Sequence, residues 1–348
     1  MTTASRPALL EDLAGSPPPE IVEGPGMLAF PRHWQVPAAT EKTAWERVAA
    51  RGGLPGARYL GMPWATAIDG LRTRAAPTLD ILRALGTIRR HPHPEGAADR
   101  IVTVAQHIYA DRYVGLFRGA GVTDLFWSHA TVNRPEIAGI RIHPFPLFPA
   151  QTPDGIEPAD PHRPRRWLAN FVGAYNPKVY ITDVRARIFE TGGADDVLIV
   201  RREAWHFDRA VYAEQMKGVA PDAARLALER QHRDEYLQAI RDSVFTLCPT
   251  GSGPNSIRIG EALALGSIPV ILTRDLALPG DRALWEACCL FEDDSAEGYT
   301  RALAAMRAMP AAEIRARQTA ARDLFAMIGP SAYADLVIGR LAVTAPAG

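Results

Sequence analysis

The segment from Val244 to Leu272, VFTLCPTGSGPNSIRIGEALALGSIPVIL, constrains the fold of this chain more than any other feature. Its two ends, VFTLC and SIPVIL, are short apolar runs of residue types that favour β-strands. Between them, SIRIGEALAL leaves room for about ten helical residues before Gly266. Two buried strands joined through one short helix form a right-handed parallel crossover. The segment therefore predicts an α/β domain with a parallel sheet.

The loop between the first strand and the helix predicts an anion-binding site. In open parallel sheets, ligands bind beyond the carboxyl ends of the strands, where this loop lies. We expect Gly251 and Gly253 to adopt positive φ and to let the backbone approach a ligand closely. Asn255 or Ser256 is expected to cap the helix. Together with Ser252, the free amides and the positive end of the helix dipole would then hold an anion.

Two charged residues on the short helix extend this prediction. Arg258 lies in the first turn, where a cation is unfavourable for the isolated helix but favourable beside a bound diphosphate. Glu261 follows three residues later on the same face, and its carboxylate could accept hydrogen bonds from a ribose diol. The alternative is a surface ion pair worth about 0.2–0.5 kcal/mol. The segment matches neither a Walker A loop nor a G-x-G-x-x-G fingerprint.

The length of 348 residues predicts two domains. Residues 1–40, rich in proline, alanine and glycine, are interpreted as a loose lead-in. Residues 41–150 alternate strand-like and helix-like segments, which predicts a first α/β domain. The proline-rich residues 151–166 are interpreted as a linker. Residues 167–348 predict a second α/β domain that ends in closing helices.

Composition and charge exclude several classes of protein. Lysine plus arginine and aspartate plus glutamate both total 39, which argues against a broad nucleic-acid-binding surface. The three cysteines form no C-x-x-C pair, so neither a zinc knuckle nor a redox motif is indicated, and reduced thiols are expected. We find no signal-peptide pattern and no run of about 20 apolar residues. The expected location is cytoplasmic, with peripheral contact at an inner membrane left open.

In the opening segment the sequence resembles the exostosin family of glycosyltransferases, family 47. The shared pattern is a strand ending in cysteine and proline, a glycine loop, Ser-x-Arg-x-x-Glu-Ala-Leu and Gly-x-Ile-Pro-Val-Ile-Leu. It stands here as Cys248-Pro249, Gly251 and Gly253, Ser256, Arg258, Glu261-Ala262-Leu263 and Gly266 to Leu272. The cysteine and proline are adjacent here, whereas the family has one residue between them. Weaker similarity covers most of Trp167 to Trp285, and GVTDLFWSHAT and HPFPLFP resemble bacterial relatives.

The resemblance implies an α/β fold of the GT-B type, with two Rossmann-like domains facing across a cleft. The C-terminal domain would bind a nucleotide-diphosphate sugar of the UDP or GDP type, and the N-terminal domain would bind a glycan or lipid-linked glycan acceptor. Family members generally invert the anomeric centre without a D-x-D-bound metal, and this chain contains no D-x-D. No cofactor is expected beyond the donor substrate. A bacterial-type hexosyltransferase in surface-polysaccharide synthesis is the expected activity.

An inverting transferase needs a base that deprotonates the acceptor hydroxyl. We expect it in the N-terminal domain near the carboxyl end of a strand, where His107 and His129 follow apolar runs. Asp124 and Asp111 are alternatives. His129 is preferred because the neighbouring Trp127 would lower the local polarity and keep the pKa of the imidazole down.

A second phosphate contact is expected beside Arg258. Arg185 or Arg187, in the helix that follows FVGAYNPK, could provide it, and Lys178 is an alternative. Each of these residues could equally be an exposed cation. Trp285 could lie near the nucleotide or in the core.

Two other functions remain open at this stage. One is a different GT-B enzyme, such as a sugar epimerase or a phosphotransferase that uses a CDP-activated polyol. The other is a non-catalytic scaffold that binds a nucleotide sugar. Product analysis with a panel of nucleotide donors separates the first alternative, and tight binding without turnover would indicate the second.

Overall fold

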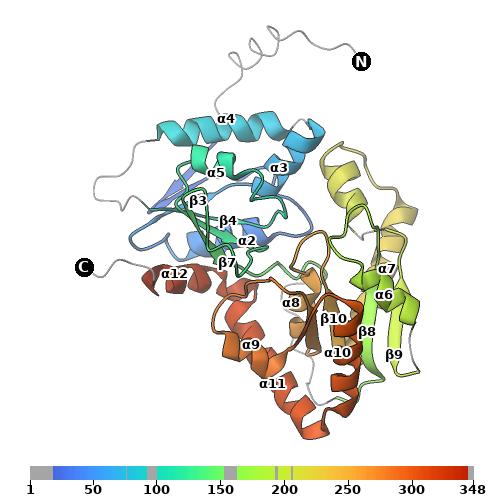
Figure 1. Cartoon of the computed structure of the whole chain (residues 1–348). Helices are drawn as coiled ribbons and strands as arrows, with labels where there is room; N and C mark the ends of the chain where they lie inside the picture. The colour runs from blue at the N-terminus through green and yellow to red at the C-terminus, as the bar shows by residue number, and fades with distance from the viewer. Residues whose placement is uncertain are drawn as a thin grey trace.

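The computed structural model describes residues 19–75, 77–91, 100–152, 163–192, 195–204 and 207–343. These residues form two α/β domains, each built on its own sheet, with one domain above the other (Figure 1). Most of the predicted linker, residues 153–162, lies outside the described residues. The two Rossmann-like domains confirm the predicted GT-B type architecture.

The first domain contains a seven-stranded sheet in the order β1-β2-β3-β4-β5-β7-β6. Five strands from β2 to β7 run parallel, and the outer strands β1 and β6 are antiparallel to their neighbours. The strands are β1 Val22–Gly24, β2 Met27–Ala29, β3 Arg58–Gly61, β4 Ile101–Ala105, β5 Asp124–Trp127, β6 Glu136–Ile137 and β7 Ile140–Pro144. The helices are α2 Thr40–Ala50, α3 Trp64–Thr73, α4 Pro77–Arg90 and α5 Val114–Gly119.

The predicted lead-in up to residue 40 is wrong for its second half. The strand β2 pairs in parallel with β3 and buries all three of its residues. Its side chains Met27 and Leu28 join the two hydrophobic clusters of this domain. The first domain therefore begins by Val22, because tertiary pairing orders a segment whose composition indicates a loop.

The second domain contains a five-stranded parallel sheet in the order β12-β11-β10-β8-β9. Its strands are β8 Trp167–Gly173, β9 Val197–Arg201, β10 Ser243–Pro249, β11 Ile268–Leu272 and β12 Leu290–Glu292. Its helical segments are α6 Val184–Thr191, η1 Ala210–Gln215, α7 Ala223–Arg241, α8 Ile257–Ala264, α9 Arg282–Cys288, α10 Ala296–Ala308 and α11 Ala311–Ile328. The predicted crossover β10–α8–β11 is confirmed, with Phe245 opposite Ile268 in a parallel register.

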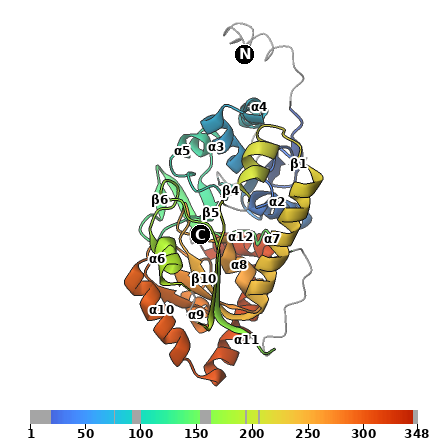
Figure 2. The same cartoon turned by 90° about the vertical axis from the view of Figure 1, so that its right-hand side faces the viewer.

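The closing helix α12, Tyr333–Val343, follows the turn η2, Pro330–Ala332, and returns to the first domain. Its buried residues Tyr333, Val337 and Leu341 join a core cluster with Val48 and Tyr59 of the first domain. Figure 2 shows α12 beside α2. The prediction that every closing helix belongs to the second domain is therefore wrong for α12, because its apolar face completes the other core.

One helical stretch among the described residues, Ala311–Val343, is long and apolar enough, by length and composition alone, to cross a membrane. This differs from the expectation that no segment approaches such a span. Half of its most apolar window is buried within the protein. The stretch comprises α11, η2 and α12, whose apolar faces pack against protein cores. Core packing therefore accounts for its hydropathy.

Candidate functional site

The loop between β10 and α8 is in contact with the first domain. Asn255 Nδ2 donates to the backbone oxygen of Ser128, at 2.6 Å. A β-carbon added to Gly253 would lie 2.6 Å from His129 Nδ1 and 3.0 Å from Ile108. Ser128 and His129 follow β5, and Ile108 follows β4. The carboxyl ends of strands from both sheets therefore meet at this loop.

The two loop glycines have a steric role that differs from the expected one. Positive φ angles occur at other glycines but not at Gly251 or Gly253, so that expectation is wrong. Gly253 leaves space for His129, and a β-carbon at Gly251 would lie 3.3 Å from Arg185 Nη2. A side chain at either position would therefore press on a candidate site residue.

The predicted helix cap is only partly realised. Ser256 occupies the N-cap position of α8, but its hydroxyl makes no capping bond and is buried without a partner. Asn255 Oδ1 instead accepts the Ser256 amide, at 2.7 Å. The Gly251 amide donates to the Gly253 carbonyl, at 3.0 Å, around the half-buried Ser252. Two amides that were expected to be free are thus used inside the loop.

Two arginines from different helices converge beside this loop. Arg185 of α6 and Arg258 of α8 lie against the same ring, Phe171, with guanidinium carbons 5.6 and 5.0 Å from its centroid. Arg258 Nη2 donates to Val172 O at 2.7 Å, and its Nε is buried without a partner. The buried Arg185 donates to three carbonyls at the ends of β8 and β10, those of Thr250 at 2.7 Å, Ala174 at 3.2 Å and Pro249 at 3.4 Å.

Neither arginine of this pair is bonded to a carboxylate of the described residues, although the buried Glu261 is close enough to Arg258 for the two groups to interact electrostatically. In the part of the chain that the structure describes, neither Arg185 nor Arg258 forms a salt bridge. Burial and the neighbouring Arg258 lower the pKa of Arg185 to about 9. Placing two cations together away from water is unfavourable unless an anion joins them. The pair therefore predicts an anion-binding site at the carboxyl edge of the second sheet.

Glu261 has a different environment from the one expected. It does not pair with Arg258; its Oε2 accepts the Tyr236 hydroxyl and its Oε1 accepts the Gln151 amide, at 3.0 Å. Burial raises the pKa of Glu261 despite these bonds, and only 1% of the residue is exposed. The expectation that its carboxylate is open to a ribose is therefore wrong for this arrangement. No local sequence pattern indicates Gln151 or Tyr236 as partners of Glu261, because both are distant along the chain.

His129 is the candidate base that lies at the domain contact. It is buried, and its Nδ1 has no hydrogen-bond partner. Burial and the neighbouring His107 lower the pKa of His129 to about 3, so the imidazole is neutral at pH 7. The Trp127 ring lies 6.5 Å away, edge-on. The direction of the pKa shift is the one expected, and a free lone pair faces the loop.

His107 cannot supply a lone pair in this structure. Its Nδ1 accepts the Tyr109 amide, at 3.0 Å, so the hydrogen of the neutral ring lies on Nε2. The Nε2 lies 3.2 Å from Asp69 Oδ1 and donates to it. Both ring nitrogens are therefore used in the fold, and the expectation that His107 acts as a base is not supported by its contacts.

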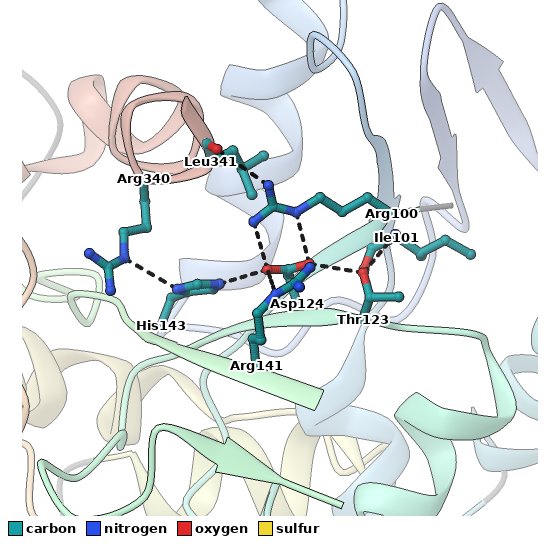
Figure 3. A network of polar contacts seen from close by, with 8 residues as sticks. All are labelled: Arg100, Ile101, Thr123, Asp124, Arg141, His143, Arg340 and Leu341. Carbon is teal, nitrogen blue, oxygen red and sulfur yellow. Dashed lines mark hydrogen bonds and ion pairs between the residues drawn. The ribbon is translucent and has the colours of Figure 1, made fainter. Parts of the chain in front are cut away.

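Asp124 lies at the opposite end of the sheet from this site. It is the first residue of β5, is completely buried and is surrounded by donors (Figure 3). Burial alone would raise the pKa of Asp124, but the hydrogen bonds outweigh it and hold the pKa well below its usual range. The donors are Arg100, Arg141, His143 and Thr123. As a candidate base Asp124 is therefore wrong, because it begins a strand and has no open oxygen.

The other predicted residues are more exposed or serve the core. Lys178 is exposed in the loop after β8. Arg187 is exposed and pairs with Asp183 and Glu190. Asp111 pairs with Arg134, at 2.8 Å. Trp285 is buried and donates to Pro279 O, at 2.8 Å.

Two cavities of the protein lie away from the arginine pair. A cavity of about 20 Å³ lies between the domains, lined by Asn255, Ser256 and Tyr333 among others. A larger one, of about 220 Å³, lies at the amino ends of β3 and β4, lined by Arg58, Arg89, Arg118 and apolar residues. The structure's described part contains no cluster of histidine, cysteine, aspartate or glutamate suited to a metal ion. The assignment of the site therefore rests on charge and contacts.

Sequence reasoning missed two buried carboxylates that fix the end of β4. Glu41 accepts the amides of Ala65 and Gln106, and burial raises its pKa to about 8. Asp69 accepts hydrogen bonds from His107, Gln35 and Arg72. No motif marks either residue, although Glu41 lies in the first turn of a helix, where a carboxylate is favourable.

Comparison with known proteins gives a family match and distant relatives. The Exostosin GT47 domain matches residues 116–292. A probable beta-1,4-xylosyltransferase, IRX10L of Arabidopsis thaliana, is 27% identical over 137 residues, 39% of this chain and 31% of the relative. A probable glucuronosyltransferase, GUT1 of Oryza sativa subsp. japonica, is 40% identical over 70 residues, 19% of this chain and 17% of the relative. The chain thus spans at most about a third of the length of these relatives.

Solved structures resemble the chain over most of its length but only distantly. The UDP-forming trehalose-phosphate synthase of Burkholderia xenovorans has a TM-score of 0.42 and 13% identity, covering 86% of this chain and 77% of that one. The pneumococcal O-GlcNAc transferase GtfA has a TM-score of 0.38 and 10% identity, covering 87% and 60%.

Proposed function

The chain belongs to the Exostosin GT47 domain family of glycosyltransferases, and from this premise we propose that it transfers a sugar from a nucleotide-diphosphate donor bound at the Arg185–Arg258 pair. The observation that carries the proposal is this pair of cations, neither of which is bonded to a carboxylate among the residues described. The pair lies beside the loop with Gly251 and Gly253 and the amino end of α8. A departing nucleotide diphosphate supplies the missing negative charge. The carbonyls around Arg185 hold its guanidinium in place before the donor binds.

We propose that transfer inverts the anomeric centre. The acceptor hydroxyl gives its proton to His129 Nδ1, its oxygen bonds to the anomeric carbon, and the bond to the diphosphate breaks with its electron pair on the leaving group. The low pKa of free His129 makes it a weak base. The negative charge of a bound donor raises that pKa and so favours proton uptake.

The finer features of the activity are proposals that the family resemblance supports. They are a hexose as the transferred sugar, UDP or GDP as the carrier, no required metal, and a bacterial role in surface-polysaccharide synthesis. The acceptor would be a glycan or lipid-linked glycan. A cytoplasmic location, with peripheral contact at the inner membrane, belongs to the same proposal.

Calorimetric titration with UDP and GDP tests the phosphate assignment. Arg258→Ala is expected to weaken binding by about 10- to 100-fold, because it removes a charge-assisted contact. Arg187→Ala is the matched control, since Arg187 lies on α6 with Arg185 but pairs with Asp183 and Glu190 at the surface. A thermal unfolding curve for each variant separates loss of binding from loss of folding. Unchanged affinity of Arg258→Ala would contradict the assignment.

A non-catalytic donor-binding protein is the second candidate. The observation that favours it is the engagement of both nitrogens of His107, which leaves only the weakly basic His129 at the domain contact. Donor binding with neither hydrolysis nor transfer, unchanged by His129→Ala, would support this candidate over the enzyme.

A further inference from the structure

Four flat side chains form a continuous stack that starts at the arginine pair. The Arg185 guanidinium lies 5.6 Å from the Phe171 centroid and 4.4 Å from the Tyr180 centroid. Tyr180 in turn stacks on Tyr175, with centroids 5.9 Å apart and planes inclined by 23°. Phe171 and Arg185 are buried, whereas the two tyrosines are half-buried. This ring stack therefore runs from the sheet toward solvent and ends at Tyr175.

The loop that carries the tyrosines is fastened to the glycine loop. The Ile181 amide donates to Gly251 O, at 3.0 Å, and the hydroxyls of Thr182 and Thr250 are 2.8 Å apart. Tyr180 Cε1 lies 3.7 Å from the position of a β-carbon on Gly251. The ring stack is thus a fixed part of the carboxyl edge.

The glycine loop has two different neighbours. Gly253 faces His129 of the first domain, and Gly251 faces Arg185 and Tyr180. A donor whose diphosphate lies at the arginines has its sugar on one side and its nucleoside on the other. The sugar must reach the acceptor and the proposed catalytic base, His129. The nucleoside therefore lies on the opposite side, next to Tyr180 and Tyr175.

We propose that Tyr175, supported by the Tyr180 ring on which it stacks, forms the platform for the donor's nucleobase. The proposal rests on the proposed function, because it takes the diphosphate to lie at Arg185 and Arg258. A nucleobase extends a stack of flat groups, and stacking on tyrosine does not depend on which base is present. The neighbouring Val179 and Ile181 are 51% and 54% exposed and add an apolar rim. Nothing in the ring stack selects between uracil and guanine.

Titration of single variants with UDP, GDP and inorganic pyrophosphate tests the platform. Tyr175→Ala is expected to weaken binding of UDP or GDP by about 5- to 100-fold and to leave pyrophosphate binding unchanged. Tyr175→Phe keeps the ring and is expected to bind all three as the unaltered protein does. Pro177→Ala, an exposed change in the same loop at a residue with no predicted role in binding, is the matched control.

The possible results separate the two proposals. Full nucleotide affinity in Tyr175→Ala, with loss in Arg258→Ala, would overturn the platform and leave the diphosphate site standing. An equal loss of nucleotide and pyrophosphate in Tyr175→Ala would also overturn it, because the base would not be the part recognised. If the unaltered protein binds none of the three ligands, the proposed function fails and the platform fails with it.

Discussion

Gly253 and His129 are in close contact where the two domains meet, and this contact determines which side chains can occupy both positions. The imidazole approaches the glycine so closely that any side chain at this position would force the imidazole or the loop to shift. His129 keeps its unpaired Nδ1 only while this contact excludes water. Glycine is therefore required at position 253 because of the space that His129 occupies, and not because of the conformation of the loop backbone.

Gly253→Ala is expected to destabilise the closed domain arrangement by about 1–3 kcal/mol, as is usual for overpacking. The added β-carbon would lie 2.6 Å from His129 Nδ1, so one partner must move. Chemical unfolding of Gly253→Ala, His129→Ala and the double variant measures the effect. The double variant should lose less than the sum of the single losses, and strict additivity would contradict the contact.

Glu41 predicts a pH dependence of stability. Burial raises its pKa from 4.5 to about 8, so the folded protein keeps a proton that the unfolded chain releases. The stability that this proton contributes is fully present below about pH 4.5 and is lost as the pH rises through about 8. Glu41→Gln should flatten the fall in unfolding free energy between these pH values. Urea unfolding at about pH 5 and pH 8 measures it, and parallel curves for the two proteins would contradict the assignment.

At the scale of elements, the crossover β10–α8–β11 could be predicted because its information is local. A β-branched run, a short helical run and a closing glycine lie within one continuous segment. The strands β1 and β2 could not be predicted, since strands of three residues have no measurable period; β1 depends on pairing with β2, and β2 on pairing with β3. On α7, Leu226 and Leu228 are 38% and 41% exposed, so two of its leucines do not face the core.

Arg165 links the carboxyl ends of two helices, α7 and α8, near the amino ends of the strands of the second sheet. Its guanidinium donates to carbonyls at the carboxyl end of α7 and just after α8, with distances of 2.8 Å to Arg241 O and 2.7 Å to Gly266 O. A cation is favourable at the carboxyl end of a helix, and here the single guanidinium of Arg165 stabilises the carboxyl ends of two helices.

Arg165→Ala should therefore lower the free energy of unfolding by roughly 2–4 kcal/mol, because it leaves several inward-facing carbonyls without a donor. The neighbouring Arg166→Ala is the matched control, since Arg166 is exposed and only stacks on Trp167, at 4.6 Å. Equal stability of the two variants in chemical unfolding would refute the capping role.

At the scale of the molecule, Asp124 links the first domain to the closing helix (Figure 3). Its donor Arg100 also donates to Leu341 O of α12, at 3.3 Å. Its donor His143 accepts from Arg340 Nε of the same helix, at 3.3 Å. One buried carboxylate thus organises the contacts that hold α12 on the first domain.

Asp124→Asn is expected to destabilise the protein by roughly 3–5 kcal/mol, because Arg100 and Arg141 then share a neutral partner. The matched control is Asp196→Asn, since Asp196 also receives two bonds from one arginine, Arg307, but is 43% exposed. The control should cost about 1 kcal/mol or less. Chemical unfolding of both variants measures the difference, and similar losses would show that Asp124 gains nothing from its burial.

The candidate site could be predicted only in part, because some of its contacts join segments that are far apart in the chain. The glycine loop, Arg258 and the choice of Arg185 or Arg187 follow from positions relative to strand ends, which local sequence defines. The contacts of Glu261 with Gln151 and Tyr236, and of His129 with Gly253, join segments far apart in the chain. Only the folded arrangement shows which candidates face the loop and which are engaged elsewhere.

The return of α12 to the first domain sets the order in which the protein can be completed. Segments at the amino end emerge from the ribosome first, yet Tyr333, Val337 and Leu341 are the last of the described residues needed to close that core. Until they arrive, the apolar patch around Val48 and Tyr59 faces water. A chain cut short before α12 therefore leaves the domain proposed to hold the acceptor unfinished, and cellular proteases can recognise such a product by its exposed surface.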